Sequence, residues 1–460
     1  MTSNKKPSSG GVGFLRAISV LVGGTAAAHA VTALAMPLLS RLYSPAEFGG
    51  LAVFMGIVTT VSVAACLRFD VAVALPESDD DGMTLLVLSL IAALGVALMA
   101  SLVVVLIFDQ LSGWIKEPAL NQGKWLIPAG IFGAAAWSAL QNWQIRKHNF
   151  GLMAQARFAQ STVAAGTQAG AAFAGIGPLG LLLGPTLAFF ASSALFLRRS
   201  WREFGNWLCR RRIAEMRRVA HEYRRFPIYS TWEALFNQAA IHLPIIMIAA
   251  VATAAEAGYL MLAMYVLQAP MGLLGAAIGQ AYLSRAPQAL RDGRIAEFTN
   301  EVLGNLIKTG AGPIVAVGIL SPVIFPLLFG TAWDRAGWLV AWMTPWFLFQ
   351  FLASPVSMVL HVLGAQRVAM QLQLFSLLVR LGLTWLAVQV LPERVAESYA
   401  LSGAVVYLGY FVVIQAHLGS TGGSARGVAL FAAARWVVPW VFGSLMIALG
   451  IAHMMSRLAY

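Results

Sequence analysis

Charged residues and cysteines are scarce in this chain of 460 residues. Only 11% of the residues are charged and 59% are hydrophobic, while cysteine occurs twice, at Cys66 and Cys209. So few charges cannot coat a soluble protein of this length. The two cysteines provide neither a disulfide framework nor the spacing of a metal site. The composition therefore predicts an all-α polytopic membrane protein.

Several enzyme motifs are absent as well. The sequence has no Gly-rich phosphate loop followed by Lys-Ser or Lys-Thr, which excludes that type of nucleotide-hydrolysing motor. His-Glu-x-x-His, Gly-x-Ser-x-Gly and Cys/His clusters are missing too, so we expect no catalytic site, metal site or cofactor. The acidic run Asp79-Asp80-Asp81 lies between Pro76 and Gly82, a composition that favours a solvated loop over a sugar-donor site.

Long apolar runs are the main feature that is present. Twelve of them are long enough to cross a hydrocarbon core of about 30 Å. They lie at residues 15–39, 50–67, 83–108, 125–145, 158–176, 179–197, 228–251, 257–283, 302–329, 337–361, 368–391 and 398–418. A thirteenth run at 428–453, interrupted by Arg435, is either a further span that leaves the carboxyl terminus outside or a partly interfacial helix.

The distribution of basic residues predicts the orientation. Cytoplasmic loops carry an excess of Lys and Arg, and a cytoplasmic amino terminus places most of the 31 such residues in cytoplasmic segments. The segment 198–226 alone contains ten arginines and three glutamates. This topology, together with anionic lipid headgroups, accounts for the net charge of +12 without a nucleic-acid partner.

The same basic segment divides the chain into two halves. We predict a cytoplasmic tail at 1–13, a six-helix lobe at 14–197, a basic cytoplasmic linker at 198–226, a second six-helix lobe at 227–418 and the additional helix at 428–453. Six spans in each half is an even number, so both halves enter the membrane from the same side. The two lobes are then parallel repeats related by a pseudo-two-fold axis along the membrane normal.

A short motif supports this duplication. The run from Ala46 to Leu51, AEFGGL, is matched 209 residues later by the run from Ala255 to Leu260, AEAGYL. Pro37 of the first span falls within two positions of Pro244 under the same offset. Proline-broken helices at equivalent places are where transporters tend to build their sites.

Polar side chains within the spans are the candidate substrate-binding residues, because a charge at the bilayer centre costs on the order of 3 kcal/mol. In the span 228–251, Glu233 and Asn237 share a stripe with Pro244, and Gln238 and His242 lie on the adjacent flank. We predict that these four polar residues and those of other spans face a substrate cavity. The others are Arg16, His29, Gln268, Gln280, Lys308, Gln350 and Arg380.

Each of these residues has a structural alternative. Arg16, Arg68 and Arg146 lie near span ends, where the side chain can extend to the lipid headgroups. Histidines such as His29 and His242 can join neighbouring helices by hydrogen bonds. Trp333 and Trp338 are expected to be interfacial anchors rather than a sugar platform.

Two runs carry a family resemblance. Arg41 to Gly49, RLYSPAEFG, is followed by a helix and then by Arg68 to Pro76, RFDVAVALP. This pattern resembles the amino-terminal signature of bacterial polysaccharide-biosynthesis membrane proteins. These are the Wzx-type, O-antigen flippases of the multidrug/oligosaccharidyl-lipid/polysaccharide exporter superfamily. The span count and the basic central segment agree with the resemblance over essentially the whole chain.

The resemblance implies two bundles arranged in a V that carry an undecaprenyl-pyrophosphate-linked oligosaccharide across the bacterial inner membrane by alternating access. The partners would be that lipid-linked substrate, membrane lipids, a coupling ion (H⁺ or Na⁺) and polysaccharide polymerase machinery. Cations would bind phosphate, amides would bind sugar hydroxyls, and Glu233 would be the ion-linked switch. Arg68 and Asp70 are candidates for a cytoplasmic gate. The product could be O-antigen, capsule, exopolysaccharide or another envelope polymer.

Two other classes remain open. A drug or metabolite antiporter of the same superfamily would share the helical plan. A membrane-embedded polymerase or glycosyltransferase would need a large external loop with paired acidic or Arg/His residues. The longest external connection, at about 109–124, has Asp109 and Glu117 but no such constellation.

Overall fold

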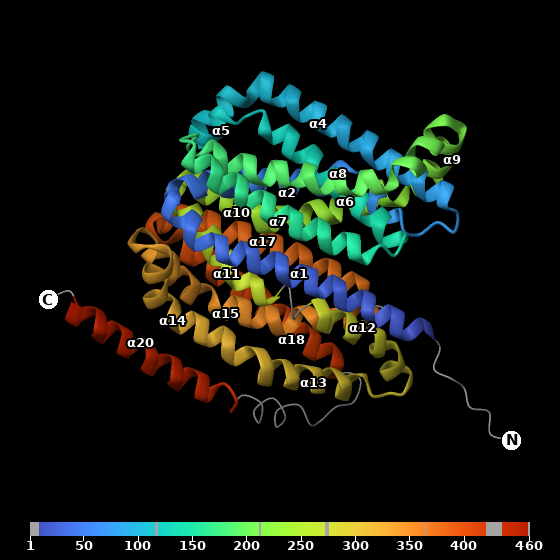
Figure 1. Cartoon of the computed structure of the whole chain (residues 1–460). Coiled ribbons are helices and arrows are strands. Elements are labelled where there is room, and N and C mark those ends of the chain that lie inside the picture. Colours follow the sequence, from blue (N-terminus) through green and yellow to red (C-terminus); the bar gives the residue numbers. More distant parts are fainter. Residues whose placement is uncertain are drawn as a thin grey trace. The chain divides into compact units, whose positions relative to one another are not determined.

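The computed structural model describes the backbone of residues 9–115, 118–210, 213–271, 276–363, 365–419 and 435–458. All regular elements within these ranges are helices (Figure 1), so the all-α prediction is confirmed. The first half contains α1 (Ser9–Leu42), α2 (Pro45–Ala65), α3 (Phe69–Ala72), α4 (Asp79–Ile115), α5 (Pro118–Gln122), α6 (Leu126–Arg146), α7 (Phe150–Phe173), α8 (Leu179–Arg210), α9 (Ile213–Glu222) and η1 (Phe226–Ser230).

The second half begins with α10 and ends near the carboxyl terminus. Its elements are α10 (Thr231–Val251), α11 (Ala254–Pro270), α12 (Ala276–Arg291), α13 (Ile295–Leu306), η3 (Ile307–Ala311), α14 (Gly312–Phe329), η4 (Thr331–Trp333), α15 (Asp334–Val356), α16 (Val359–Val362), α17 (Gln366–Val390), η5 (Pro392–Arg394), α18 (Val395–Gly419) and α20 (Val438–Leu458). Among these, η1 and η3 are π-helical turns, and η4 and η5 are 3₁₀ turns.

The helices form two compact units. Unit 1 comprises residues 1–42 and 54–238, and unit 2 comprises residues 43–53 and 239–460. Two helices therefore contribute to both units: α2 begins in unit 2 and continues in unit 1, while α10 begins in unit 1 and continues in unit 2.

Many of the helices can cross a membrane. Eight helical stretches of the described chain meet the length and hydropathy of a membrane span, which establishes a multi-pass membrane protein. The predicted run 257–283 includes most of α11, which ends at Pro270, and the start of α12, which begins at Ala276, and residues 272–275 between them lie outside the described residues. The predicted run 302–329 contains the π turn η3, an irregularity that often marks functional positions in helices.

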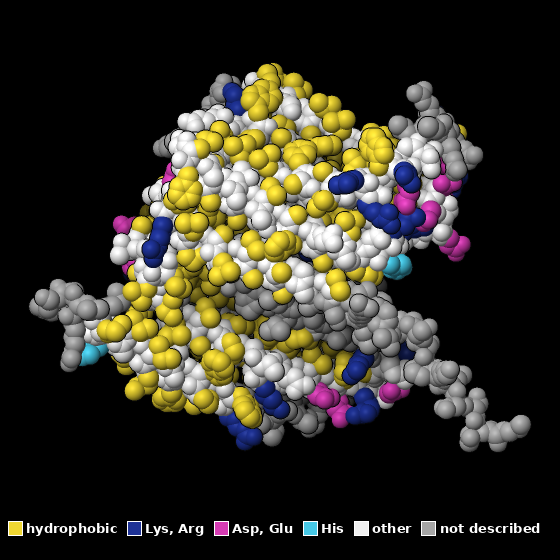
Figure 2. Space-filling view, in the orientation of Figure 1, with side chains coloured by type: hydrophobic (Ala, Val, Ile, Leu, Met, Phe, Trp, Pro, Cys, Tyr) yellow, Lys and Arg dark blue, Asp and Glu magenta, His cyan; other side chains and the backbone are white. Residues whose placement is uncertain are grey.

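In unit 1, α4, α6 and α8 pack together, and α7 packs against both α1 and α8. Trp143 of α6 is buried in this core. The basic segment 198–226 is helical over most of its described length, because α8 continues to Arg210 and α9 follows. Figure 2 shows hydrophobic side chains over much of the visible face, with charged side chains gathered near α9. This distribution is that of a membrane-embedded bundle with a polar end.

In unit 2, α15 packs between α14 and α18, with Phe347 and Phe351 in the core. Helix α20 packs against α14. The approach depends on Gly312, because a Cβ atom there would overlap the indole ring of Trp440. Residues 428–434 of the predicted thirteenth run lie outside the described residues, and Val438–Met454 is a shorter apolar helix. Its spanning of the membrane stays a prediction.

Candidate functional site

Helices α1 and α7 form a polar contact within unit 1. They approach closely at Gly24, where a Cβ atom would overlap the Cβ atom of Ala154. At the next residue of α1, the Oγ1 atom of Thr25 accepts a hydrogen bond of 2.7 Å from the guanidinium of Arg157 on α7. His29, one turn further along α1, is exposed. A cation and an imidazole are thus placed on two neighbouring helices.

Arg157 is absent from the predicted site residues. Hydropathy starts the fifth span at residue 158, whereas α7 begins at Phe150. Arg157 therefore lies about two turns inside the helix. The available signal is the polar composition of α7, which also carries Gln155, Gln160 and Gln168. Polar residues lower the hydropathy of a span that packs against other helices, and a hydropathy window then misplaces its start.

The predicted cytoplasmic gate has unusual backbone geometry. Leu67 and Arg68 both adopt left-handed conformations, with φ of 50° and 58°. Such consecutive non-glycine residues store strain, which is frequent at functional and switching positions. Asp70 is 3% exposed, and its Oδ2 atom accepts a hydrogen bond of 2.7 Å from the hydroxyl of Ser138. No ion pair joins Arg68 to Asp70 in the part of the chain that the structure describes. The gate role stays a prediction.

The acidic run after this segment begins helix α4, and Asp79 and Asp80 are exposed to solvent. Asp79 and Asp81 lie in the first turn of α4, where the helix dipole favours carboxylates. Asp79 pairs with Arg146 at 2.9 Å and with Lys147 at 2.6 Å, and Asp81 pairs with Arg218. The prediction of a loop is wrong because helix α4 starts earlier than its apolar run, whereas the predicted exposure to solvent agrees with the structure.

Arg146, which could have extended to the lipid headgroups, is instead bonded within the protein. Its side chain is 9% exposed, and its Nη1 atom donates to the carbonyl oxygens of Val73 at 3.2 Å and Pro76 at 2.6 Å. The planar guanidinium can bind several acceptors at once. Arg146 therefore fixes the segment between α3 and α4 onto the end of α6.

The polar stripe predicted on the span 228–251 lies on α10. Glu233 is exposed in the first turn, and Asn237, Gln238 and His242 are half-buried. Glu233, Asn237 and Gln238 belong to unit 1, whereas His242 belongs to unit 2. One helix thus carries hydrogen-bonding groups along the stretch where the chain passes from one unit to the other.

The remaining predicted residues of unit 2 lie on three different elements. Gln268 on α11 is exposed, Gln350 on α15 is half-buried, and Lys308 is exposed within the π turn η3. No hydrogen bond connects these three side chains among the described contacts. The side chains of Arg16 and Gln280 lie outside the described residues.

Arg380 on α17 is enclosed by aromatic rings of unit 2. It is 2% exposed, and its guanidinium carbon lies 4.3 Å from the ring centre of Trp346 and 5.8 Å from those of Tyr399 and Tyr407. Arg380 donates to the hydroxyl of Tyr399 at 3.4 Å, and this hydroxyl donates to the carbonyl of Ile241 on α10 at 3.0 Å. The described residues provide no carboxylate partner for this cation. Cation–π contacts are its main compensation.

A second arginine of unit 2, Arg335, joins three helices. Arg335 on α15 bonds Glu256 on α11 at 3.1 Å and Glu397 on α18 at 2.6 Å. Sequence analysis did not single out Arg335, although its partner Glu256 belongs to the repeated motif. Arg335 and Glu256 are partly exposed and Glu397 is buried, so the network fixes the three helices relative to one another at this point.

The two copies of the repeated motif pack against each other. A Cβ atom on Gly49 would overlap the carbonyl oxygen of Ala254, and one on Gly258 would overlap the carbonyl oxygen of Pro45. Ala254 is 209 residues after Pro45, and Gly258 is 209 residues after Gly49, so the contact is reciprocal. Both helices also begin alike, with Ser44 and Glu47 or Thr253 and Glu256 at the positions of a capping box.

This crossing buries a tryptophan that the sequence assigns to the membrane interface. Trp333 is fully buried, with its ring centre 5.0 Å from that of Phe48 and 5.9 Å from that of Tyr259. The anchor prediction is wrong for Trp333, because the residues beside the two glycines cover its ring. Trp338 is 52% exposed, as an interfacial tryptophan would be.

Solved structures with a similar fold are flippases and multidrug transporters. The lipid II flippase MurJ in an inward closed conformation aligns with a TM-score of 0.60 at 12% identity, over 94% of this chain and 98% of that one. An inward-facing MATE family transporter of the MOP superfamily aligns with a TM-score of 0.54 at 14% identity, over 87% and 94% of the chains. A MATE transporter of Vibrio cholerae gives 0.56 at 14% identity, over 88% and 96%. The chain therefore shares the fold of these transport proteins.

The sequence defines the family within this fold class. Residues 38–337 match the model of the family described as polysaccharide biosynthesis protein, and the chain belongs to this family. The matched range includes both runs that carry the resemblance, from Arg41 to Gly49 and from Arg68 to Pro76. No curated protein sequence matches the chain. Family and fold agree with the prediction of a transport protein rather than an enzyme.

Proposed function

We propose that the protein is a flippase that moves a polyprenyl-pyrophosphate-linked oligosaccharide across the bacterial inner membrane for the synthesis of a surface polysaccharide. The family match carries this proposal, and the fold of flippases and transporters supports it. The amino terminus would be cytoplasmic, because most lysines and arginines then lie in cytoplasmic segments. Lobes at 14–197 and 227–418 would alternate between inward and outward access.

The polar side chains suit a charged, hydroxyl-rich cargo. A pyrophosphate and a string of sugars cannot cross hydrocarbon unless other groups replace their water. Arginine and lysine would bind the phosphates, and amides would bind sugar hydroxyls. We assign these roles to Arg16, Arg157, Lys308 and Arg380 as cations and to Asn237, Gln238, Gln268, Gln280 and Gln350 as amides, with His29 and His242 as further hydrogen-bonding groups. The polyprenyl tail would remain in the lipid.

Deleting the gene tests this function directly. We expect lipid-linked oligosaccharide to accumulate in the cytoplasmic leaflet and surface polysaccharide to be lost. The measurement is the leaflet distribution of the glycolipid in membrane vesicles of known orientation. Restoration by the full-length chain is the control for effects on neighbouring genes. Unchanged lipid carriers together with an intact surface glycan would contradict the proposal.

A drug or metabolite antiporter is the second candidate, favoured by the similarity to MATE transporters. Ion-driven export of a cationic compound from vesicles, without any change of the surface glycan on deletion, would support it. The two functions therefore predict opposite outcomes for the polysaccharide.

A further inference from the structure

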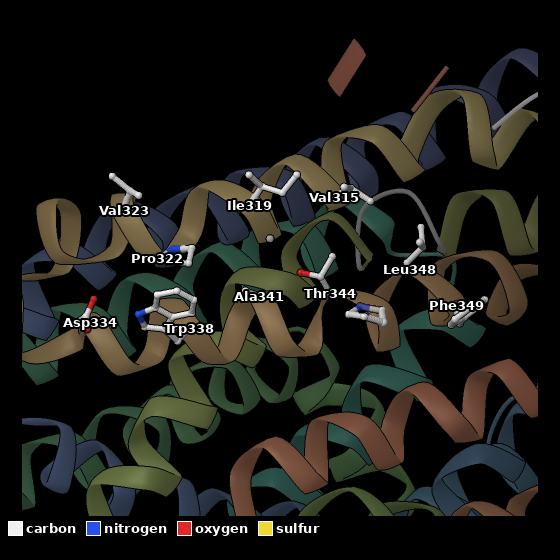
Figure 3. Close-up of a pocket in the computed structure, with 12 residues that line it drawn as sticks. Val315, Ile319, Pro322, Val323, Asp334, Trp338, Ala341, Thr344, Leu348 and Phe349 are labelled. Atoms are coloured by element: carbon white, nitrogen blue, oxygen red, sulfur yellow. The ribbon is translucent and has the colours of Figure 1, made fainter. Parts of the chain in front are cut away.

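Unit 2 has an elongated apolar groove between α14 and α15 (Figure 3), with a volume of about 730 Å³. Along α14 it is lined by Val315, Gly318, Ile319, Pro322 and Val323. Asp334 and Trp338 lie at one end of the groove, and Leu348 and Phe349 lie toward the other (Figure 3). Both helices belong to stretches that can cross a membrane. The groove therefore runs along the bundle at hydrocarbon depth.

Two close approaches hold α14 and α15 together, and the residues of the first, Gly318 and Thr344, line the groove. A Cβ atom on Gly318 would overlap the hydroxyl of Thr344, and one on Gly337 would lie 2.6 Å from the carbonyl oxygen of Ser321. The hydroxyl of Thr344 donates to the carbonyl of Val340 at 2.8 Å, and that of Ser321 bonds the carbonyl of Gly337 at 2.9 Å. Thr344 contributes the one hydroxyl among the lining residues, and because this hydroxyl is bonded inside the protein, the groove is largely nonpolar, which suits a hydrocarbon chain.

The end at Asp334 is acidic. Asp334 is exposed and makes no ion pair within the described residues. The neighbouring guanidinium of Arg335 is already bonded to Glu256 and Glu397, so it is not available to a lipid phosphate. Three carboxylates thus accompany one arginine at this end. Such a balance attracts an ammonium group and repels a group that carries only negative charge.

We propose that this groove binds one acyl chain of a phospholipid whose headgroup carries a primary amine. The ammonium would pair with Asp334, and the indole of Trp338 would lie at the level of the headgroup. From Asp334 to Phe349 the helix rises about 22 Å at 1.5 Å per residue. Half of a hydrocarbon core is about 15 Å thick, so the groove can accommodate an acyl chain from the headgroup level past the bilayer midplane.

The same charge pattern argues against a polyprenyl pyrophosphate as the occupant. Its diphosphate would lie beside Asp334, where the described residues offer no cation except the already paired Arg335, and the like charges would repel each other. The amine-headed lipid satisfies both the apolar groove and its acidic end. This inference is independent of the proposed cargo, because it concerns a lipid held at the side of unit 2.

Native mass spectrometry of the purified full-length protein tests the site. The protein would be mixed with phosphatidylethanolamine, phosphatidylcholine or phosphatidylglycerol of identical acyl chains, and the retained lipid would be counted. We expect preferential retention of phosphatidylethanolamine. Asp334→Asn should lower its preference over phosphatidylcholine by about twofold to fivefold, as expected for an exposed ion pair. Ala341→Trp, which fills the groove, should lower retention of all three lipids.

Two control variants test whether the changes in lipid retention are specific to the groove. Asp292→Asn removes an exposed carboxylate elsewhere in unit 2, and Val405→Trp adds an indole to an exposed position of α18 outside the groove. Both should retain lipid as the unaltered protein does. Equal retention of the three lipids, or a preference that Asp334→Asn leaves unchanged, would overturn the proposal. A parallel sample receives undecaprenyl phosphate. If this lipid were retained more strongly than phosphatidylethanolamine, and Ala341→Trp abolished its retention, the groove would be assigned to a polyprenyl chain instead.

Discussion

Arg380 shows how a single residue can indicate a function that its contacts do not explain. A buried charge without a carboxylate partner costs several kcal/mol of desolvation. Its cation–π contacts with the aromatic rings stabilise the folded state by about 2 kcal/mol. The hydrogen bond of 3.4 Å to Tyr399 adds little stability. The folded unit would be as stable with an apolar side chain of similar size. We infer that the charge of Arg380 serves transport rather than stability.

The first prediction therefore concerns Arg380→Met. We expect a thermal unfolding midpoint equal to or above that of the unaltered protein, because the substitution removes the desolvation cost. We expect the rate of glycolipid flipping to fall at least tenfold, because charge-assisted binding of phosphate is lost. Thermal unfolding in detergent and flipping in proteoliposomes measure the two effects. Arg380→Lys keeps the charge and is the matched control. A large fall in the unfolding midpoint with Met would show a structural role instead.

A second prediction at the residue scale concerns Glu233, which is exposed in the first turn of α10. If its protonation or sodium binding couples transport to an ion gradient, Glu233→Gln should abolish the dependence of flipping on that gradient. Proteoliposomes with imposed pH or sodium gradients provide the measurement. Glu301→Gln changes an exposed carboxylate on α13 and should have no effect. Flipping by Glu233→Gln that responds normally to both gradients would exclude this role.

The sequence predicted which residues are unusual, but it did not predict the side chains that surround them. Arg380 is visible in the sequence as a cation within an apolar run, but the rings of Trp346 and Tyr407 that enclose it come from two other helices. Periodicity describes one helix face at a time. It cannot predict which faces meet, so the partners of a buried polar residue become visible only in the packed bundle.

At the scale of elements, the reciprocal crossing of α2 and α11 depends on two glycines. A valine at Gly49 or at Gly258 would overlap backbone atoms, which cannot move aside as a side chain can. We predict that Gly49→Val and Gly258→Val each destabilise the protein by about 1–3 kcal/mol or more, the cost of overpacking. Because the contact is reciprocal, the two effects should be similar. Thermal unfolding of the purified variants gives the comparison.

Gly95→Val is the matched control for these two variants. Gly95 lies on an exposed face of α4, and a Cβ atom there would meet nothing within 4 Å. We expect its unfolding midpoint to equal or exceed that of the unaltered protein, since valine has the higher helix propensity. If all three variants lost similar stability, the close approach would not be the cause.

Hydropathy predicted the helical runs but not their irregularities. The π turn η3 lies inside a run that was predicted to be continuous. A π turn changes hydrogen bonding without changing composition, so a hydropathy window cannot detect it. The motif shared by α2 and α11 was visible in the sequence, whereas its packing against itself required the structure.

At the scale of the whole molecule, composition alone established the class, and two short runs established the family. The scarcity of charge requires a membrane environment, and the runs from Arg41 to Gly49 and from Arg68 to Pro76 carry the resemblance that the family match confirms. The substrate is less predictable. Site residues contributed by many helices depend on packing, and one fold can serve different cargoes.

The orientation in the membrane is the last prediction. It follows from the distribution of lysine and arginine, so it can be tested with single cysteines in a variant that lacks Cys66 and Cys209. Asn121→Cys on α5 and Asp292→Cys after α12 lie at exposed positions and are predicted to face opposite sides. In spheroplasts, a membrane-impermeant maleimide should label Asn121→Cys at once. It should label Asp292→Cys only after the inner membrane is permeabilised. The reverse labelling pattern would contradict the predicted topology. The basic segment 198–226, which includes α9, would then face the periplasm instead of the cytoplasm.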